Sequence, residues 1–140
     1  MKKFIFNEVL QGRLNKGDDI MEALTKVITQ NHIVAGVITA IGAISKAKIG
    51  YFDQELKRYE EREFNEPMEI LSLMGNISLK DDMPFCHLHI VLSRKDYSVI
   101  GGHLYSGSMV YALEYNIVPF HGGSFKRNMD SETGLYLWER

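Results

Sequence analysis

Hydrophobic residues recur at helical spacing in one stretch of the chain, which begins just after Gly17. Asp18 and Asp19 offer side-chain oxygens that can cap a helix N-terminus, and Glu22 stands three residues beyond Asp19, as in a capping box. The apolar residues of the following turns share one face: Ile20, Ala23, Leu24, Val27 and Ile28. The pattern predicts an amphipathic helix whose apolar face packs on the core.

Elsewhere, short apolar or alternating segments follow one another with turn residues between them. They lie at residues 3–11, 33–52, 56–64, 69–79, 84–94, 99–105, 109–118 and 135–138. Many consecutive strands with one early helix favour an antiparallel sheet over the strand–helix alternation of a parallel sheet. We therefore predict an α+β fold, with a mostly antiparallel twisted sheet or sandwich and one main helix packed on it. No repeat or linker divides the chain, so we expect a single domain over residues 1–140.

The segment 33–52 is too long and too rich in glycine for one flat strand. Gly36, Gly42 and Gly50 interrupt it. Glycine inside a strand often marks a bulge or the close approach of another backbone. We expect either two strands or one sharply bent strand, with the break near Ile41 and Gly42.

The most informative pattern is a histidine-bearing hairpin over residues 84–104. Side chains alternate across a strand, so His87 and His89 project from one face. The other face is apolar and consists of Cys86, Leu88, Ile90 and Leu92. If residues 95–97 form the loop, position 89 lies opposite 103, 90 opposite 102 and 92 opposite 100. This register keeps the apolar face continuous, whereas a slip by one residue would break it. We therefore expect His103 beside His89.

Three imidazoles on one face of a hairpin can converge on one metal ion. Opposed residues have Cβ atoms about 5 Å apart, and alternate residues along a strand lie about 7 Å apart. We therefore expect His87, His89 and His103 to bind a divalent metal such as zinc and to leave an open coordination position. Glu114 and His121 are candidates for additional site residues. The alternative is that the histidines only line a polar face or a subunit contact through hydrogen bonds.

Two adjacent glycines precede His103 in the predicted hairpin. Gly101 and Gly102 would weaken a strand, and the usual compensation is room for a bulge, another chain or a ligand. The sequence leaves these three interpretations open. Each of them places His103 in a tight environment.

Composition narrows the classes of function. The chain has 140 residues and a net charge of −2, which argues against the broad basic footprint of a protein that grips nucleic acid by its phosphates. Lys126 and Arg127 form a small basic patch, insufficient alone to predict nucleic-acid binding. The single cysteine, Cys86, calls for no oxidising compartment. The longest weakly polar run, 33–44, has 12 residues, against about 20 for a membrane-spanning helix. We expect a soluble, cytoplasmic protein with no membrane partner.

Four segments occur in a specific order: 40–43 (AIGA), 69–78 (EILSLMGNIS), 84–89 (PFCHLH) and 101–104 (GGHL). Together they resemble the plant-and-prokaryote-conserved (PPC) domain family over nearly the whole chain. The resemblance implies an antiparallel sheet with a packed helix, assembled as a homotrimer. In plants the domain follows an AT-hook that binds DNA, and prokaryotic single-domain relatives carry a DNA-binding label. This chain contains no Arg-Gly-Arg-Pro AT-hook. Some prokaryotic relatives resemble metal binders through histidines that match those of the hairpin.

Three hypotheses about function follow. The first is a homotrimeric PPC-type protein that binds a divalent metal through His87, His89 and His103. The second is an assembly or DNA-associated module in which the histidines have a structural role only. The third is a metal-dependent enzyme that acts on a small molecule near the hairpin, with Glu114 or His121 as general acid or base.

Overall fold

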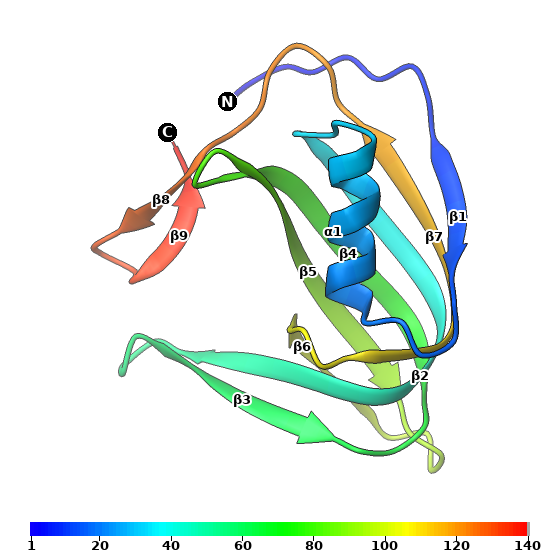
Figure 1. Cartoon of the computed structure of the whole chain (residues 1–140). Coiled ribbons are helices and arrows are strands. Elements are labelled where there is room, and N and C mark those ends of the chain that lie inside the picture. Colours follow the sequence, from blue (N-terminus) through cyan, green and yellow to red (C-terminus); the bar gives the residue numbers. More distant parts are fainter. Residues whose placement is uncertain (140) are drawn as a thin grey trace.

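One antiparallel sheet of seven strands and one helix make up most of the structure, a computed structural model that describes residues 1–139 (Figure 1). The elements in chain order are β1 (Leu10–Leu14), α1 (Ile20–Gln30), β2 (Gly36–Asp53), β3 (Arg58–Phe64), β4 (Met68–Lys80), β5 (Met83–Ser93), β6 (Val99–Leu104), β7 (Met109–Pro119), β8 (Arg127–Asp130) and β9 (Leu135–Trp138). Strands β8 and β9 form a separate two-stranded sheet. The fold is therefore mostly β with one short helix, and it contains more β structure than the predicted α+β class implies.

Strand β2 organises the large sheet because it has neighbours on both sides. Its first half lies between β4 and β7, and its second half pairs with β3 and β6. The pairing with β4 shifts register between Ala40 and Gly42. At Gly42 the φ angle is 147°, and a Cβ atom would collide with the carbonyl oxygen of Ala112, so this position requires glycine. The predicted break near Ile41 and Gly42 is confirmed, in the form of one bent strand.

Strand β6 joins the two ends of this bent sheet. It pairs with β5 on one side and with the second half of β2 on the other, so β2, β4, β5 and β6 form a closed ring of neighbours. A Cβ atom at Gly102 would lie 2.6 Å from the carbonyl oxygen of Gly50, and one at Gly101 would lie 2.6 Å from that of Ile90. The two glycines therefore accommodate neighbouring strands of the same chain.

The helix α1 lies on the concave side of the curved sheet (Figure 1). Its N-cap is Asp19, whose side chain accepts a hydrogen bond from the Glu22 backbone N–H at 3.1 Å, as the sequence predicts. Ile20, Leu24 and Ile28 are fully buried in the core. Burial of each such side chain contributes about 1.5–3 kcal/mol. Across the described residues, no helix is long and apolar enough to cross a membrane.

The N-terminal strand begins later than predicted. The sequence pattern predicts a strand over residues 3–11, whereas β1 pairs with β7 only from Leu10 onward. Ile5 makes just an isolated bridge to His121. The side chains of Ile5 and Phe6 are 73% and 64% exposed. Apolar residues favour a strand only where they have neighbours to pack against, and these two have none in the sheet.

Strand β8 is the element that the sequence pattern does not predict. Three of its four residues are polar, and most are poor strand formers, but it pairs with β9, the predicted C-terminal strand. The hairpin lies beside β4, where the Leu79 backbone N–H donates to the carbonyl oxygen of Phe125 at 2.9 Å. The side chain of Arg127 is only 8% exposed. The prediction that Arg127 belongs to a surface basic patch is therefore wrong, because this hairpin is packed against the sheet.

Candidate metal centre

The β5–β6 hairpin has the predicted register. Residue 89 lies opposite 103, 90 opposite 102 and 92 opposite 100. The inner face of β5 packs in the core with four buried side chains: Cys86, Leu88, Ile90 and Leu92. His87 and His89 alternate with these residues and project from the outer face, where His103 joins them from β6. Strand alternation and a short loop are thus sufficient to bring the three histidines together.

The ring nitrogens of these histidines converge. One nitrogen of each ring lies within 4.8 Å of the nitrogens of the other two. The Nε2 atoms of His87 and His89 are 3.2 Å apart, and the ring centroids of the three pairs are separated by 5.0 to 5.3 Å. Two nitrogens bound to one tetrahedral zinc ion at about 2.0–2.1 Å would be about 3.4 Å apart. The spacing therefore suits a shared ion.

Burial keeps two of the three rings neutral at pH 7. The pKa of His87 is lowered to about 4, first by burial and then by the positive charge of Arg127. The pKa of His103 is also lowered to about 4, first by burial and then by His89. Each neutral ring has one nitrogen lone pair that can bind a metal ion. Nδ1 of His103 is buried and has no hydrogen-bond partner among residues 1–139. A ligand would satisfy this atom.

Arg127 lies directly behind His87 and is the residue of this site that the sequence does not reveal. Its Nε donates to Ser78 Oγ at 2.8 Å, its Nη2 to Asn76 Oδ1 at 2.7 Å and its Nη1 to the Tyr136 carbonyl at 3.0 Å. Nη2 also lies 3.3 Å from Nδ1 of His87. Asn76 is the β4 partner of His87 in the sheet. The β8–β9 hairpin and β4 therefore hold the guanidinium group against the histidine.

His87 can carry its ring proton in one of two arrangements. Arginine only donates hydrogen bonds, so its contact with His87 favours a proton on Nε2 of His87, which can then donate to Nε2 of His89. In this arrangement a hydrogen bond joins His87 and His89 without a metal ion. A metal ion instead requires the lone pair of Nε2, so the ring proton moves to Nδ1, and the guanidinium group of Arg127 must then turn away because both groups would be donors. The separation of the ring nitrogens fits both arrangements, the contact with Arg127 fits only the first, and metal analysis distinguishes them.

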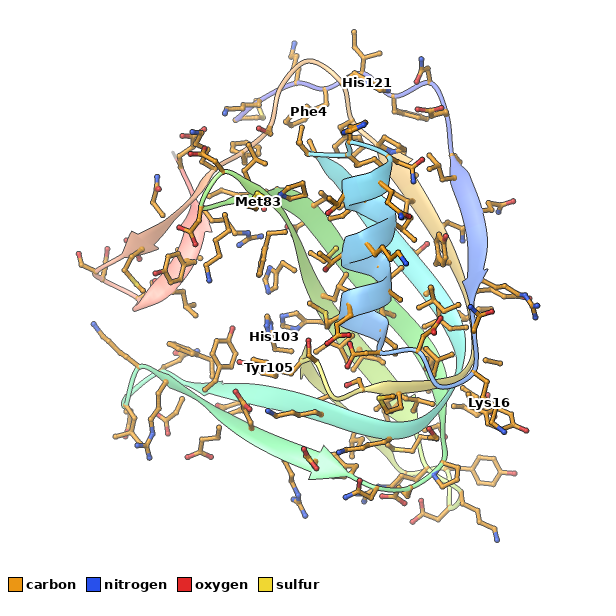
Figure 2. All side chains as sticks on the ribbon, in the orientation of Figure 1. Phe4, Lys16, Met83, His103, Tyr105 and His121 are labelled. Carbon is orange, nitrogen blue, oxygen red and sulfur yellow. The ribbon has the colours of Figure 1, made fainter. Side chains whose placement is uncertain are left out.

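A cavity of about 460 Å³ adjoins His87 and His103. Residues of the β2–β3 and β8–β9 hairpins line it, and His103 and Tyr105 lie together between these hairpins in Figure 2. The ring centroids of Tyr59 and Tyr105 are 5.0 and 4.9 Å from that of His103. Burial raises the pKa of Tyr105 to about 12, so its phenol stays protonated. His87 and His103 thus form part of the wall of a space large enough for a small molecule.

The sequence matches the family model described as the Plants and Prokaryotes Conserved (PCC) domain, also abbreviated PPC, over residues 2–121. The chain belongs to this family. The predicted resemblance is therefore confirmed, and the antiparallel sheet with one packed helix is the PPC fold. A search among proteins with curated descriptions found no match.

Three solved structures illustrate how similar this PPC chain is to known proteins. A metal-containing protein from Archaeoglobus fulgidus is 43% identical, with a TM-score of 0.93 and 100% of both chains covered. A PPC protein from Pyrococcus horikoshii is 31% identical, with a TM-score of 0.93 and coverage of 100% of this chain and 96% of that one. A candidate DNA-binding protein from Bacteroides thetaiotaomicron is 29% identical, with a TM-score of 0.87 and coverage of 97% and 96%.

The PPC fold places the other two predicted site residues away from the histidine cluster. Glu114 lies on β7, where it pairs with Ile41 of β2 and is exposed. His121 contacts Asn7 Oδ1 through its Nε2 at 3.1 Å, and Figure 2 shows it well separated from His103. Among residues 1–139, the side chains that converge closely enough to hold a metal ion are those of His87, His89 and His103. Glu114 and His121 do not belong to this group.

Proposed function

We propose that this PPC protein is a homotrimer that binds a divalent metal ion, with zinc as the first candidate, through His87, His89 and His103. The observation that carries the proposal is the convergence of three ring nitrogens within 4.8 Å. Neutral imidazole is a ligand that zinc prefers, and three protein nitrogens leave one position of a tetrahedral ion open. The description of the Archaeoglobus fulgidus relative as metal-containing supports the proposal.

The chemistry of such a site follows from its donors. An ion with an open position polarises a bound oxygen or lowers the pKa of a bound water. Arg127 contacts Nδ1 of His87, on the side of the ring opposite Nε2, and Asn76 accepts a hydrogen bond from the same guanidinium group. A small molecule in the adjoining cavity would lie next to the ion. Glu114 and His121 are outside the group of converging histidines, so the proposal assigns them no part in binding the ion.

Metal analysis tests the proposal most directly. Protein purified without an affinity tag and examined by inductively coupled plasma mass spectrometry is expected to contain about one ion per chain, and His89→Ala is expected to lose it. His32→Asn is the matched control, because His32 is exposed, lies outside the cluster and has a φ of 54°, which asparagine tolerates. Absence of metal from the wild type, or equal metal in His89→Ala, would contradict the proposal.

The outer face of the sheet supports the homotrimer. Exposed apolar side chains from four neighbouring strands form a row there: Ile41, Leu71, Met74, Val91 and Val99. Met74 pairs with His89 in the sheet, so this row begins at the edge of the histidine cluster. Contiguous exposed apolar side chains commonly mark an interaction surface. Multi-angle light scattering is expected to give the mass of three chains. A stable monomer at micromolar concentration would exclude the trimer.

A DNA-associated module is the second candidate. The description of the Bacteroides thetaiotaomicron relative, at 29% identity, favours it. The net charge of −2 weighs against it, because binding to phosphates requires basic groups whose neutralisation releases counterions. We expect a labelled DNA duplex to show no salt-dependent binding in fluorescence anisotropy. An affinity that falls steeply with salt concentration would favour the DNA-associated module instead.

A further inference from the structure

Among residues 1–139, the buried cation Arg127 has no salt-bridge partner. Its side chain is 8% exposed. Its hydrogen-bond partners are all uncharged: Asn76, Ser78, the Tyr136 carbonyl and His87. None of the salt bridges between described residues includes Arg127. A buried charge is unfavourable unless an opposite charge compensates it, and burial lowers the pKa of Arg127 accordingly. The neutral partners hold the guanidinium group in place but leave its charge uncompensated.

The cavity that Arg127 lines has cationic walls. Lys57, Arg58 and Lys80 line it too, whereas no Asp or Glu is found among the described residues around it. Nζ of Lys80 lies 4.1 Å from the ring centroid of Tyr136, and no salt bridge within residues 1–139 includes this lysine. A divalent ion on three neutral imidazoles would add further positive charge. The cavity therefore favours an anionic occupant.

Aromatic rings form much of the remaining wall. Five of them line the cavity: Phe52, Tyr59, Phe85, Tyr105 and Tyr136. Such rings pack against apolar or planar groups and make favourable stacked or edge contacts with them. The volume of about 460 Å³ suits a small organic molecule rather than a bare inorganic ion.

We propose that this cavity binds a small organic anion, whose carboxylate or phosphate-type group pairs with Arg127 and Lys80 and whose apolar body packs against the aromatic rings. Arginine binds both kinds of group through charge-assisted hydrogen bonds. The inference rests on the proposed function in one respect, because it names the class of ligand for the site next to the proposed metal ion. The two cationic side chains belong to the chain whether or not a metal is bound.

Isothermal titration calorimetry with three probes tests the charge requirement. Benzoate and phenylphosphonate carry the two kinds of anionic group, and benzamide is the neutral analogue of benzoate. We expect one benzoate or phenylphosphonate per chain and an affinity at least about tenfold above that of benzamide, since a hydrogen bond to a charged group contributes this much or more. The stronger of the two anions identifies the natural headgroup as carboxylate or phosphate. Equal or weaker binding of both anions relative to benzamide would overturn the inference.

Substitutions test the role of the two cations. Arg127→Met and Lys80→Met are each expected to weaken benzoate binding about tenfold and to leave benzamide binding unchanged. Lys80→Met keeps the test decisive if Arg127→Met disturbs the β8–β9 hairpin. The matched control is Lys126→Met, because Lys126 neighbours Arg127 but pairs with Asp82 at 2.6 Å outside the cavity. Equal losses in Lys126→Met and Lys80→Met would overturn the inference.

The same variants separate this inference from the proposed metal site. Lys80→Met is expected to retain the metal content of the wild type while its benzoate affinity falls. Benzoate binding that depends on Lys80 in a protein that contains no metal would overturn the metal site and leave the anion site standing. Full metal content with no preference for benzoate over benzamide would overturn the anion site and leave the metal site standing.

Discussion

The two faces of strand β5 carry alternate residues of one segment and serve different purposes. On the inner face, Cys86, Leu88 and Ile90 are at most 1% exposed and pack in the core. On the outer face, His87 adjoins a cavity, and His89 pairs with Met74 of an exposed apolar row. Both faces share the same backbone, so the difference lies only in what each side of the sheet meets. Stability and binding should therefore respond to substitutions at different, alternating positions.

The largest expected effect is on the inner face. Leu88→Ala removes a fully buried side chain and is expected to lower the free energy of unfolding by about 2–5 kcal/mol, because a cavity is left behind. Urea denaturation followed by circular dichroism measures this change, and the fraction that remains folded should keep its metal. A loss below about 1 kcal/mol would show that this face contributes less to the core than its burial indicates.

On the outer face, His103→Gln should weaken metal binding and leave the stability of the chain almost unchanged. It is expected to lower metal affinity at least tenfold, which corresponds to about 1.4 kcal/mol, while the free energy of unfolding of the metal-free protein changes by less than about 1 kcal/mol. Competition with a zinc-sensitive dye measures the affinity. His121→Ala should leave the affinity unchanged, because His121 lies outside the cluster. A comparable loss of metal affinity in His121→Ala would show that His121 belongs to the metal site.

The apolar row beside the histidines offers a third comparison. Met74→Glu places a charge in the row and is expected to dissociate the proposed trimer without unfolding the chain, because Met74 is 60% exposed. Light scattering measures the mass, and circular dichroism checks the fold. Met83→Glu is the matched control, since Met83 is 61% exposed but lies outside the row. If both variants remain trimers, this row is not the interface.

The smallest effect concerns the thiol of the inner face. Burial raises the pKa of Cys86 from 9.0 to about 12. The unfolded chain loses the thiol proton at lower pH than the folded chain, so the contribution of Cys86 to stability should be constant below pH 9 and decline above it. Cys86→Ala should remove this part of the decline. At pH 8, iodoacetamide is expected to label the folded protein far more slowly than the protein in urea. Equal labelling rates would show that Cys86 is accessible.

Local patterns were sufficient for the elements whose contacts lie close together along the chain. The cap at Asp19, the bend near Gly42 and the pairing of His89 with His103 all match the structure. The cap and the histidine pairing depend on residues within one turn or one hairpin, where periodicity and turn chemistry act directly. The bend was predicted from the glycines alone, although it also depends on the close approach of Ala112 in β7. The N-terminal strand was misplaced because its pairing depends on β7, which lies about a hundred residues away, rather than on its own apolar pattern.

The sequence by itself determined the family, the helix and the hairpin that gathers three histidines, because strand alternation and a short loop fix which side chains share a face. Only the tertiary structure decided that Arg127 is buried behind His87, 40 residues away in the chain, and that cationic and aromatic side chains surround the adjoining cavity. The sequence of β8 contains no local pattern that predicts the contact between Arg127 and His87, and the sequence of the β2–β3 hairpin contains none that predicts the cavity. The physical origin of this contact is the packing of the β8–β9 hairpin beside β4, which only the folded chain brings about.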